Sequence, residues 1–188
     1  RRIIKPLKEG LKNFNDRNKS TIQIIDVATG SGRTLKQLRS AFRKEKIKGI
    51  DLSGAYLKEA SRYISDLDGD LIELIKGNAE NLPFEKDSIQ AISCVYLFHE
   101  LPRTIREKVL KEFFRVLEPG GILVLADSIQ ISDSPDYIKI MENFYKSFHE
   151  PFYCDYIKED IHSKIEEIGF NHVKSSSFFM TKVWSAIK

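Results

Sequence analysis

The sequence predicts an α/β fold built on a doubly wound sheet of seven strands, mostly parallel but with an antiparallel strand near the C-terminus. Short apolar segments alternate with stretches of helical periodicity from residue 22 onward. Residues 89–98, IQAISCVYLF, are almost continuously apolar after Gln90, which is typical of a strand covered on both faces of a parallel sheet. The last two apolar segments are too close in sequence for a helical crossover, so we expect them to pair antiparallel.

The predicted elements follow one another with only loop-sized gaps. The strands are expected at residues 22–26, 47–51, 71–76, 89–98, 122–127, 172–179 and 182–187. The helices are expected within residues 1–20, at 33–43, at 55–67, from residue 104 to Pro119-Gly120-Gly121, after Ser134-Pro135 and at 158–168. Thr104 and Glu107 have the spacing of a capping box at the start of the fourth of these helices.

The composition indicates one folded domain over residues 1–188. The chain of 188 residues is 41% hydrophobic and 30% charged, and no apolar run approaches the roughly 18 residues that a membrane-spanning helix needs. A transmembrane or disordered chain is therefore excluded. Cys94 and Cys154 have no metal-ligand spacing and belong to no dense cysteine framework, so we expect reduced thiols and a cytoplasmic protein.

The positive charge of the chain is concentrated at its start. The formal net charge is +3, yet residues 1–20 hold seven Lys/Arg against two Asp/Glu. A basic helix of this kind is most often a solvated face, so nucleic-acid binding is not favoured. The sequence begins with Arg1-Arg2 rather than with Met, and we expect that it starts inside a longer polypeptide.

A loop of small residues follows the first predicted strand. In IIDVATGSGRTL, Asp26 ends the strand, and Ala28, Gly30 and Gly32 occupy alternate positions before the next helix. Small residues let a ligand approach the backbone closely. The third glycine of the dinucleotide fingerprint would fall on Leu35, which argues against a dinucleotide site. The lysine-serine/threonine end of a P-loop is missing, which argues against an ATP site of that kind.

A second acidic residue, Asp51, ends the second predicted strand. A carboxylate at this position can accept hydrogen bonds from both hydroxyls of a ribose, which indicates a nucleoside ligand. The alternative is that Asp26 and Asp51 only cap the turns that follow them, since aspartate is common in turns.

Five motifs carry a resemblance to a known family. DVATGSG, GIDLS, GNAENLPF, FHELP and RVLEPGGILVLADS follow one another in this order within residues 22–128. Together they resemble the successive motifs of class I S-adenosylmethionine-dependent methyltransferases, in the branch of the quinone-biosynthesis C-methyltransferases. The resemblance implies a Rossmann-like fold. It also implies S-adenosylmethionine as cofactor, S-adenosylhomocysteine as product and methyl transfer to a small-molecule acceptor.

The resemblance also assigns the cofactor residues of the first loop. Asp26, Ala28, Gly30 and Gly32 would line the methionine part of the cofactor. Ala28 departs from the family pattern, which has glycine there. Its methyl group is expected near the cofactor, at some cost in affinity.

The remaining cofactor residues follow later strands. The resemblance implies that Asp51 holds the ribose and that Leu52 packs on the adenine. Asn78 and Ala79 would lie at the adenine edge, and we include Tyr96 among the cofactor contacts. Asn78 stands where many relatives have aspartate, and its amide oxygen can still accept from the adenine amino group.

His99 and Glu100 are the candidate catalytic residues, because they lie just beyond the fourth predicted strand. His99 has a reference pKa of about 6.5 and can act as a base or orient an acidic acceptor. Asp127, at the end of the fifth strand, is also well placed by topology. The alternative is that His99 and Glu100 only cap the following helix.

Residues 129–168 are expected to cover the acceptor. The segment MENFYKSFHEPFYCDY is rich in aromatic residues and suits a planar or hydrophobic acceptor, although the rings can equally supply core packing. His149 and Glu150 with the earlier His-Glu pair lack the spacing of a helix-borne metal motif, so no metal is expected.

Two other functions stay open at this point. One is a cofactor-binding module that does not transfer methyl groups, and the other is an NAD-type oxidoreductase, against which Leu35 argues. The sequence names neither the acceptor nor the oligomeric state.

Overall fold

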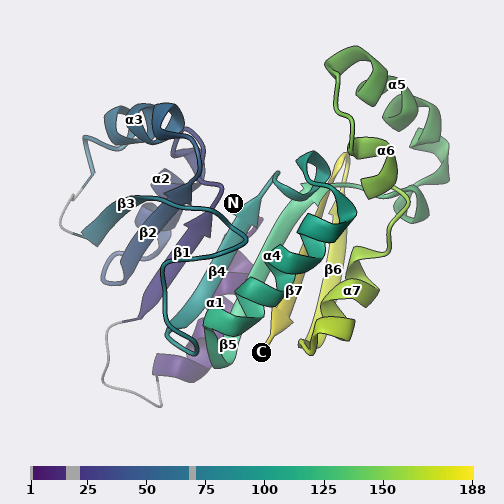
Figure 1. Ribbon diagram of the computed structural model, residues 1–188. Helices are drawn as coiled ribbons and strands as arrows, with labels where there is room; N and C mark the ends of the chain where they lie inside the picture. The colour runs from purple at the N-terminus through teal and green to yellow at the C-terminus, as the bar shows by residue number, and fades with distance from the viewer. Residues whose placement is uncertain (1, 16–21, 68–70) are drawn as a thin grey trace.

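The computed structural model describes residues 2–15, 22–67 and 71–188. Its sheet has seven strands in the order β3-β2-β1-β4-β5-β7-β6 (Figure 1). The strands are β1 (Gln23–Val27), β2 (Lys46–Asp51), β3 (Ile72–Lys76), β4 (Ile89–Val95), β5 (Leu117–Ser128), β6 (Asn171–Phe178) and β7 (Thr181–Ile187). Strands β1 to β5 pair parallel, whereas β7 runs antiparallel to both of its neighbours. The doubly wound sheet with an antiparallel C-terminal strand is therefore confirmed.

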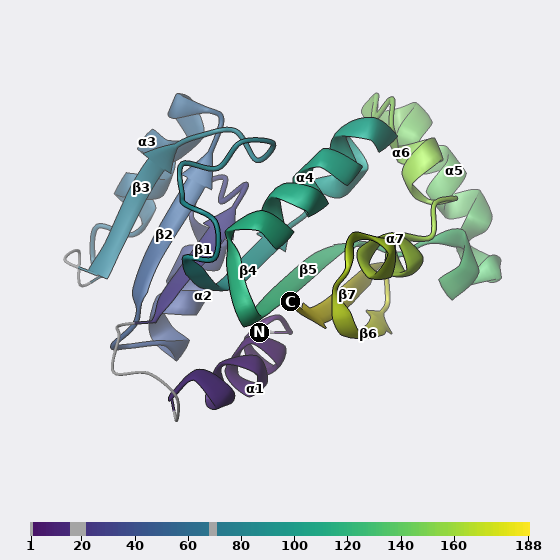
Figure 2. The same cartoon turned by 60° about the horizontal axis from the view of Figure 1, so that its bottom comes forward.

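Helices cover both faces of the sheet. They are α1 (Ile4–Asn15), α2 (Arg33–Ala41), α3 (Gly54–Tyr63), α4 (Arg103–Val116), α5 (Ile138–Phe148), α6 (Tyr153–Tyr156) and α7 (Ile161–Ile168). Figures 1 and 2 show α4 and α7 on one face and α1 on the other. Helix α1 packs with α2 through Leu7, Leu11 and Leu38. The N-terminal helix expected within residues 1–20 thus corresponds to α1, and residues 1 and 16–20 lie outside the described residues.

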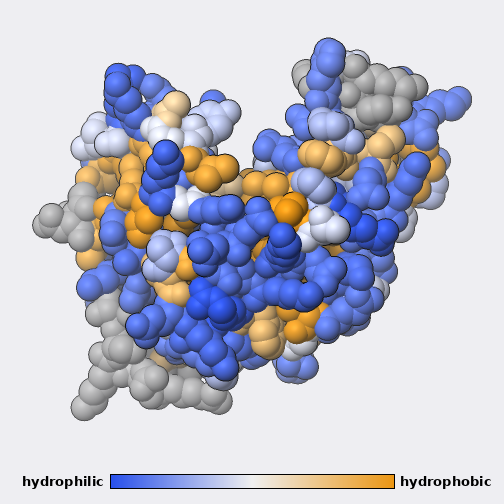
Figure 3. Space-filling model, viewed as in Figure 1, coloured by the Kyte–Doolittle hydropathy of each residue, from blue (hydrophilic) through white to orange (hydrophobic). Residues whose placement is uncertain are grey.

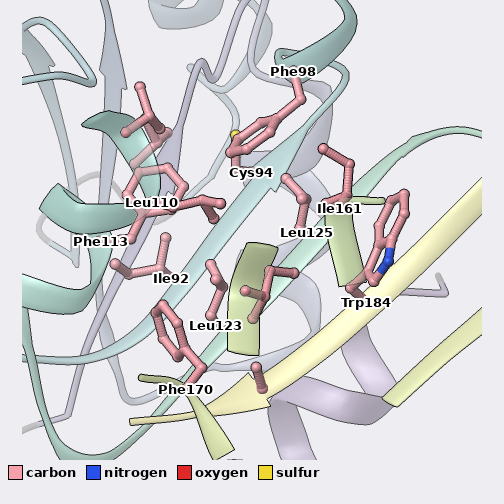
Figure 4. Close-up of a cluster of buried hydrophobic side chains, with 14 of the residues drawn as sticks. Ile92, Cys94, Phe98, Leu110, Phe113, Leu123, Leu125, Ile161, Phe170 and Trp184 are labelled. Atoms are coloured by element: carbon pink, nitrogen blue, oxygen red, sulfur yellow. The ribbon is translucent and has the colours of Figure 1, made fainter. Parts of the chain in front are cut away.

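The larger of two buried clusters fills the space between the sheet and α4, α6 and α7. Figure 4 shows Phe98, Phe113 and Trp184 in this cluster, together with aliphatic side chains of β4 and β5. Cys94 is a buried free thiol there, while Cys154 is a half-buried one. Strand β4 is buried at six of its seven positions because it lies in the middle of the sheet. The almost continuous apolar run of the sequence thus reflects the central place of β4.

The start of α4 differs from the prediction. Its N-cap is Pro102 without a side-chain hydrogen bond, so the capping box of Thr104 and Glu107 is wrong. The backbone N–H groups of Ile105 and Arg106 donate instead to the Pro102 carbonyl, and Glu107 pairs with Lys111. The helix begins one residue early, which places Thr104 inside the first turn.

The junction between α4 and β5 also differs. The helix ends at Val116, and β5 begins at Leu117, so Pro119-Gly120-Gly121 lies inside the strand rather than ending the helix. Leu117 pairs with Ile89, and the register shifts before Ala91 pairs with Ile122. The irregular start of β5 accommodates the proline, which has no N–H group to donate to a ladder.

The chain after β5 forms short helical turns before α5. The 3-10 turns η3 (Ile131–Asp133) and η4 (Pro135–Tyr137) precede α5, and Ser134 stands before the proline as expected but makes no capping bond. Asp160 caps α7 by accepting from Ser163 N at 3.1 Å. This cap lies two residues after residue 158, where the helix was expected to begin.

The sheet reverses its order between β1 and β4. The crossovers on the two sides of this point leave the sheet in opposite directions, so the carboxyl ends of β1 and β4 border a crevice. In the described part of the chain, no helix combines the length and apolarity that a membrane crossing requires.

Candidate functional site

A cleft of about 930 Å³ opens at the carboxyl ends of β1, β2 and β4. Figure 3 shows the molecule hollowed at this edge, between the part that holds α3 and the part that holds α5. The predicted site residues that line the cleft are Ala28, Gly30, Asp51, Leu52, Asn78, Ala79, Tyr96 and Glu100. Asp26, Gly32 and His99 are not among the lining residues. A cleft of this size lies at the upper end of the range for small-molecule sites.

The loop between β1 and α2 has an unusual backbone. Ala28, Gly30 and Gly32 all have positive φ, at 58°, 54° and 83°. Only glycine adopts such angles without strain, which explains the alternation of small residues in the sequence. A Cβ atom on Gly30 would meet nothing within 4 Å, whereas one on Gly32 would lie 3.1 Å from the Cβ of Ala60. Gly30 therefore borders open space, and Gly32 allows α3 to approach.

Asp26 lies below this loop, not on the cleft surface. Its carboxylate is almost fully buried and accepts from Thr29 Oγ1 and Ser93 Oγ, both at 2.6 Å. Burial raises the pKa of Asp26 to about 6, although both hydrogen bonds lower it. The side chain thus ties the loop to β4 from beneath.

Asp51 holds the loop from the cleft side. Its Oδ2 accepts from Gly30 N and its Oδ1 from Ser53 N, both at 2.8 Å. Each carboxylate oxygen keeps further acceptor capacity, and the residue lines the cleft. Leu52 follows with two-thirds of its surface exposed at the cleft, which leaves an apolar surface for a ligand to cover.

The turn after β3 forms another wall. Asn78 and Ala79 line the cleft there, and Asn78 Oδ1 accepts from Glu80 N at 3.0 Å. This bond fixes the direction of the amide and leaves its NH₂ group and one lone pair for a ligand.

Tyr96 ends β4 and separates two parts of the site. Its φ of 55° is a strained conformation for a residue other than glycine, and such outliers concentrate at functional sites. The Tyr96 hydroxyl lies 2.5 Å from Thr181 Oγ1. Tyr96 lines the cleft, and its ring meets the His99 ring edge-on, with centroids 6.2 Å apart.

His99 and Glu100 are neighbours that face different surroundings. They lie in the 3-10 turn η2 (Phe98–Glu100), because Tyr96 ends the strand earlier than predicted. His99 Nδ1 lies 2.7 Å from Oδ1 of buried Asp127, while Glu100 lines the cleft. Burial raises the pKa of the Glu100 carboxyl above its ordinary value, although the charge of His99 lowers it.

Comparison with known proteins decides the family. The model of the family described as "Methyltransferase domain" matches residues 24–121, which is more than half of the chain. The chain belongs to this methyltransferase family. The class I methyltransferase interpretation is thereby confirmed, and the NAD-type oxidoreductase is not supported.

Curated relatives agree with this family. The chain is 33% identical over 129 residues to a carboxy-S-adenosyl-L-methionine synthase of Trichodesmium erythraeum, covering 67% of this chain and 49% of that protein. It is 33% identical over 132 residues to a ubiquinone/menaquinone biosynthesis C-methyltransferase of Campylobacter jejuni, covering 68% and 53%. The chain thus spans about half the length of these two relatives.

Solved structures share the fold. A SAM dependent methyltransferase from Aquifex aeolicus superposes with a TM-score of 0.68 at 20% identity, covering 97% of this chain and 90% of that one. Phosphoethanolamine N-methyltransferase 2 of Haemonchus contortus, in complex with S-adenosyl-L-methionine, gives a TM-score of 0.72 at 13% identity, covering 96% and 52%. The Rossmann-like methyltransferase fold is therefore confirmed.

The structure adds residues to the site that sequence reasoning missed. Tyr56, in the first turn of α3, is more than half exposed and lines the cleft. Ile105 and Val109 of α4 form an apolar wall. Their spacing of four residues places them on one helix face, but that spacing is equally typical of core packing. The sequence offered no signal that separates the two.

The expected covering segment lies at the same end of the molecule as the cleft. Figure 1 shows α5 and α6 beside the carboxyl end of β5 and the amino end of β7. Tyr153 of α6 packs against Phe144 at 4.9 Å between ring centroids, and its hydroxyl lies 2.7 Å from Ser128 Oγ. These aromatic rings therefore pack at least partly against each other and against the sheet.

Proposed function

We propose that this chain transfers a methyl group from S-adenosylmethionine to a small-molecule acceptor with a planar, hydrophobic body. The observation that carries the proposal is a cleft lined by both Asp51 and Glu100, because the first carboxylate suits the hydroxyls of a ribose and the second is an ionisable group that an acceptor can meet. The relatives named as quinone-biosynthesis and demethylmenaquinone methyltransferases support an acceptor of the quinol class.

The cofactor side is supported by the chemistry of the groups present. Both Asp51 oxygens are held by backbone N–H groups and keep acceptor capacity, which fits two adjacent ribose hydroxyls. The exposed Leu52 side chain fits an adenine face, and Asn78 with Ala79 fits the adenine edge. The open space beside Gly30 fits the methionine part. Asp26 and Gly32 would support the loop rather than contact the cofactor.

The acceptor side needs a cavity of different character. Tyr96, Leu97 and Leu101 line it, and aromatic and aliphatic walls favour a flat apolar molecule. S-adenosylmethionine supplies an electrophilic methyl group on a positively charged sulfur. The protein then has to hold the acceptor in line behind that methyl group, exclude water and take up any proton that the acceptor loses.

Calorimetric titration tests the cofactor assignment. The protein is expected to bind S-adenosylhomocysteine and not NAD, and Asp51→Ala is expected to weaken binding by about 1.5 to 3 kcal/mol. Asp160→Asn is the matched control, because Asp160 also accepts from backbone but caps α7. That control should keep its affinity. Unchanged affinity in folded Asp51→Ala protein would contradict the ribose assignment.

Methyl transfer needs its own measurement. Anaerobic incubation with methyl-labelled S-adenosylmethionine and 1,4-naphthoquinol is expected to give a labelled quinol. Binding of S-adenosylhomocysteine without labelling of the quinol would contradict the quinol assignment. If a broad extract of small molecules also takes up no label, the chain is a cofactor-binding module without methyl transfer.

A further inference from the structure

Asp127 at the end of β5 is a fully buried carboxylate with three hydrogen bonds. Its Oδ2 accepts from Phe98 N at 2.8 Å, and its Oδ1 accepts from Ser128 N at 2.7 Å. The third partner is His99 Nδ1, also at 2.7 Å. Two backbone donors fix the carboxylate, so the imidazole meets a rigid acceptor.

The bond to Asp127 decides which ring nitrogen of His99 can react. A carboxylate accepts, so Nδ1 carries a proton and Nε2 holds the lone pair of the neutral ring. No described residue gives Nε2 a hydrogen bond. The His99 side chain remains 12% exposed, so it is not sealed in the core. The ring is therefore prepared to accept a proton at Nε2.

Aromatic rings hold the imidazole in place. Tyr153 and Tyr156 of α6 meet it edge-on, with centroids 6.0 and 6.3 Å away, and Tyr96 meets it from the cleft side. The Tyr156 hydroxyl donates to Ser128 O at 2.6 Å and so fixes α6 against β5. His99 thus lies next to Tyr96, which lines the cleft, and is enclosed by groups that are themselves fixed.

The charges that face His99 are acidic. These acidic groups are Asp127 of β5, Glu100 of the same turn as His99, and Glu150 of the segment before α6. Burial raises the pKa of the Tyr153 and Tyr156 phenols, so these rings carry no charge near pH 7. Burial alone would lower the pKa of His99, but the hydrogen bond and charge of Asp127, followed by the two glutamates, raise it above the ordinary value. A base with a pKa near the working pH is the most efficient kind.

We infer that Asp127 is a positioning residue that makes His99 Nε2 the proton acceptor for a hydroxyl group of the methyl acceptor. The substrate class is therefore a molecule whose hydroxyl must ionise before it is methylated, such as a phenol or a quinol. The inference rests on the proposed function and deepens it. Glu100, which faces the cleft, then orients the acceptor rather than deprotonating it.

The reaction balances without a further reagent. The acceptor O–H bond breaks, its proton goes to Nε2, and the electron pair makes the oxygen or the conjugated ring carbon nucleophilic. This nucleophile forms the new bond to the methyl carbon, while the electrons of the C–S bond remain on sulfur. When the ring carbon is the nucleophile, the hydrogen on that carbon then leaves as a proton and the oxygen regains one from solvent, which restores the aromatic quinol. The imidazolium that results is stabilised by Asp127 and later releases the proton to solvent.

The test measures the pH dependence of methyl transfer to 1,4-naphthoquinol. In the wild type the rate should rise with pH as His99 loses its proton. His99→Gln should lower turnover by about 10²- to 10⁴-fold and remove this rise. Asp127→Asn should lower turnover by roughly 10- to 100-fold and move the rise to lower pH, because the pKa of His99 falls without the carboxylate. The affinity for S-adenosylhomocysteine should stay the same in both variants.

A matched control separates positioning from mere stability. Glu112 is also a buried carboxylate, and it accepts from Leu82 N at 2.7 Å and from Arg115. It is not among the charged groups that act on His99. Glu112→Gln should lower the melting temperature without moving the pH profile. If Asp127→Asn behaves in the same way, or if Glu100→Gln rather than His99→Gln removes the rise, the inference is overturned.

A second measurement keeps the inference testable if the quinol is not a substrate. Nitrogen-15 NMR of the wild-type complex with S-adenosylhomocysteine, assigned by the signal lost in His99→Gln, reports the tautomer of the ring. The expected neutral form carries its proton on Nδ1, and the pKa of the ring is raised above the ordinary value for histidine. A proton on Nε2 in the neutral ring would overturn the inference, whatever becomes of the proposed acceptor.

Discussion

Ala28 occupies a backbone conformation that suits glycine. Its φ of 58° costs an L-residue roughly 1 kcal/mol or more, and its side chain lies at the cleft. Ala28→Gly is therefore expected to raise the free energy of unfolding by up to about 1 kcal/mol, since relief of strain outweighs the extra freedom of the unfolded chain. The affinity for S-adenosylhomocysteine should also rise. Urea denaturation and calorimetry measure the two effects.

Ala55→Gly serves as the comparison for Ala28. Ala55 lies in the first turn of helix α3, where glycine is less favourable than alanine by up to about 1 kcal/mol. The two substitutions should therefore change stability in opposite directions. Destabilisation by both would show that Ala28 is not strained.

The buried carboxyl of Asp26 makes stability depend on pH. Burial raises the pKa of Asp26 to about 6 in the folded protein, whereas the ordinary pKa of 3.8 applies to the unfolded chain. The native state thus binds more protons between these values, so its stability falls as the pH rises through this interval. Asp26→Asn should remove this fall, which amounts to at most about 1.4 kcal/mol per pH unit. Urea denaturation between pH 4 and 7 measures it.

Asp66→Asn is the control for the pH dependence. Asp66 is exposed, and its hydrogen bond to Lys36 lowers the pKa of its carboxyl, so it titrates below the interval. The slope between pH 4 and 7 should therefore remain that of the wild type. An unchanged slope in Asp26→Asn would place the origin of the pH dependence elsewhere.

The loop between β1 and α2 separates ligand binding from stability. Both Gly30 and Gly32 have positive φ, but an added Cβ points to open space at Gly30 and meets Ala60 at Gly32. Gly32→Ala should therefore lower the melting temperature more than Gly30→Ala does. Gly30→Val should weaken S-adenosylhomocysteine binding, because its branched side chain enters the cleft. Equal melting temperatures for the two alanine variants would contradict this division.

The elements were predictable where one physical signal was sufficient. Most of the strands follow from apolar runs, and all except β5, which begins five residues early, lie within a few residues of their expected positions. The capping box failed because Pro102 supplied an earlier helix start, and that choice depends on how Leu101 and Phe98 pack. The strand expected to reach residue 98 stopped at Val95, because Tyr96 adopts a left-handed conformation that its residue type does not indicate.

The sequence predicted which edge of the sheet holds the site, but not which of the side chains at that edge point into the cleft. Strand ends place Asp26 and Asp51 at the same edge, yet only Asp51 reaches the cleft. Asp26 turns toward Thr29 and Ser93, and no spacing in the sequence indicates that pairing. The contact of His99 with Asp127 likewise joins residues 28 positions apart.

At the scale of the whole molecule, one buried arginine joins the C-terminal helices to the central domain. Arg106 of α4 donates to Glu159 Oε2 at 2.6 Å, to Asp155 and to the Leu101 carbonyl. The Arg106 and Glu159 side chains are only 1% and 3% exposed. Arg106→Met should therefore cost about 3 to 5 kcal/mol, because the buried Glu159 loses its buried partner and keeps only the exposed Arg103. Urea denaturation measures the cost, and hydrogen exchange should increase in α6.

A double variant identifies the cause of that loss. In Arg106→Met/Glu159→Met neither charge is present, so much of the stability should return. Lys111→Met removes an exposed pair with Glu107 and should change stability by less than about 1 kcal/mol. If Arg106→Met costs no more than Lys111→Met, the arginine does not fasten the C-terminal helices.

Strand β6, the last in the sheet order, also governs how the protein behaves at high concentration. Its pairing with β7 is interrupted between Asn171 and Lys174, and its exposed centre consists of Ser175, Ser176 and Ser177. A sheet edge offers free backbone groups to any other extended chain, and irregular pairing, lysine and polar side chains all discourage such contact. The polarity of β6 is thus a defence against aggregation. Valine in place of the central serine would weaken that defence without touching the cleft.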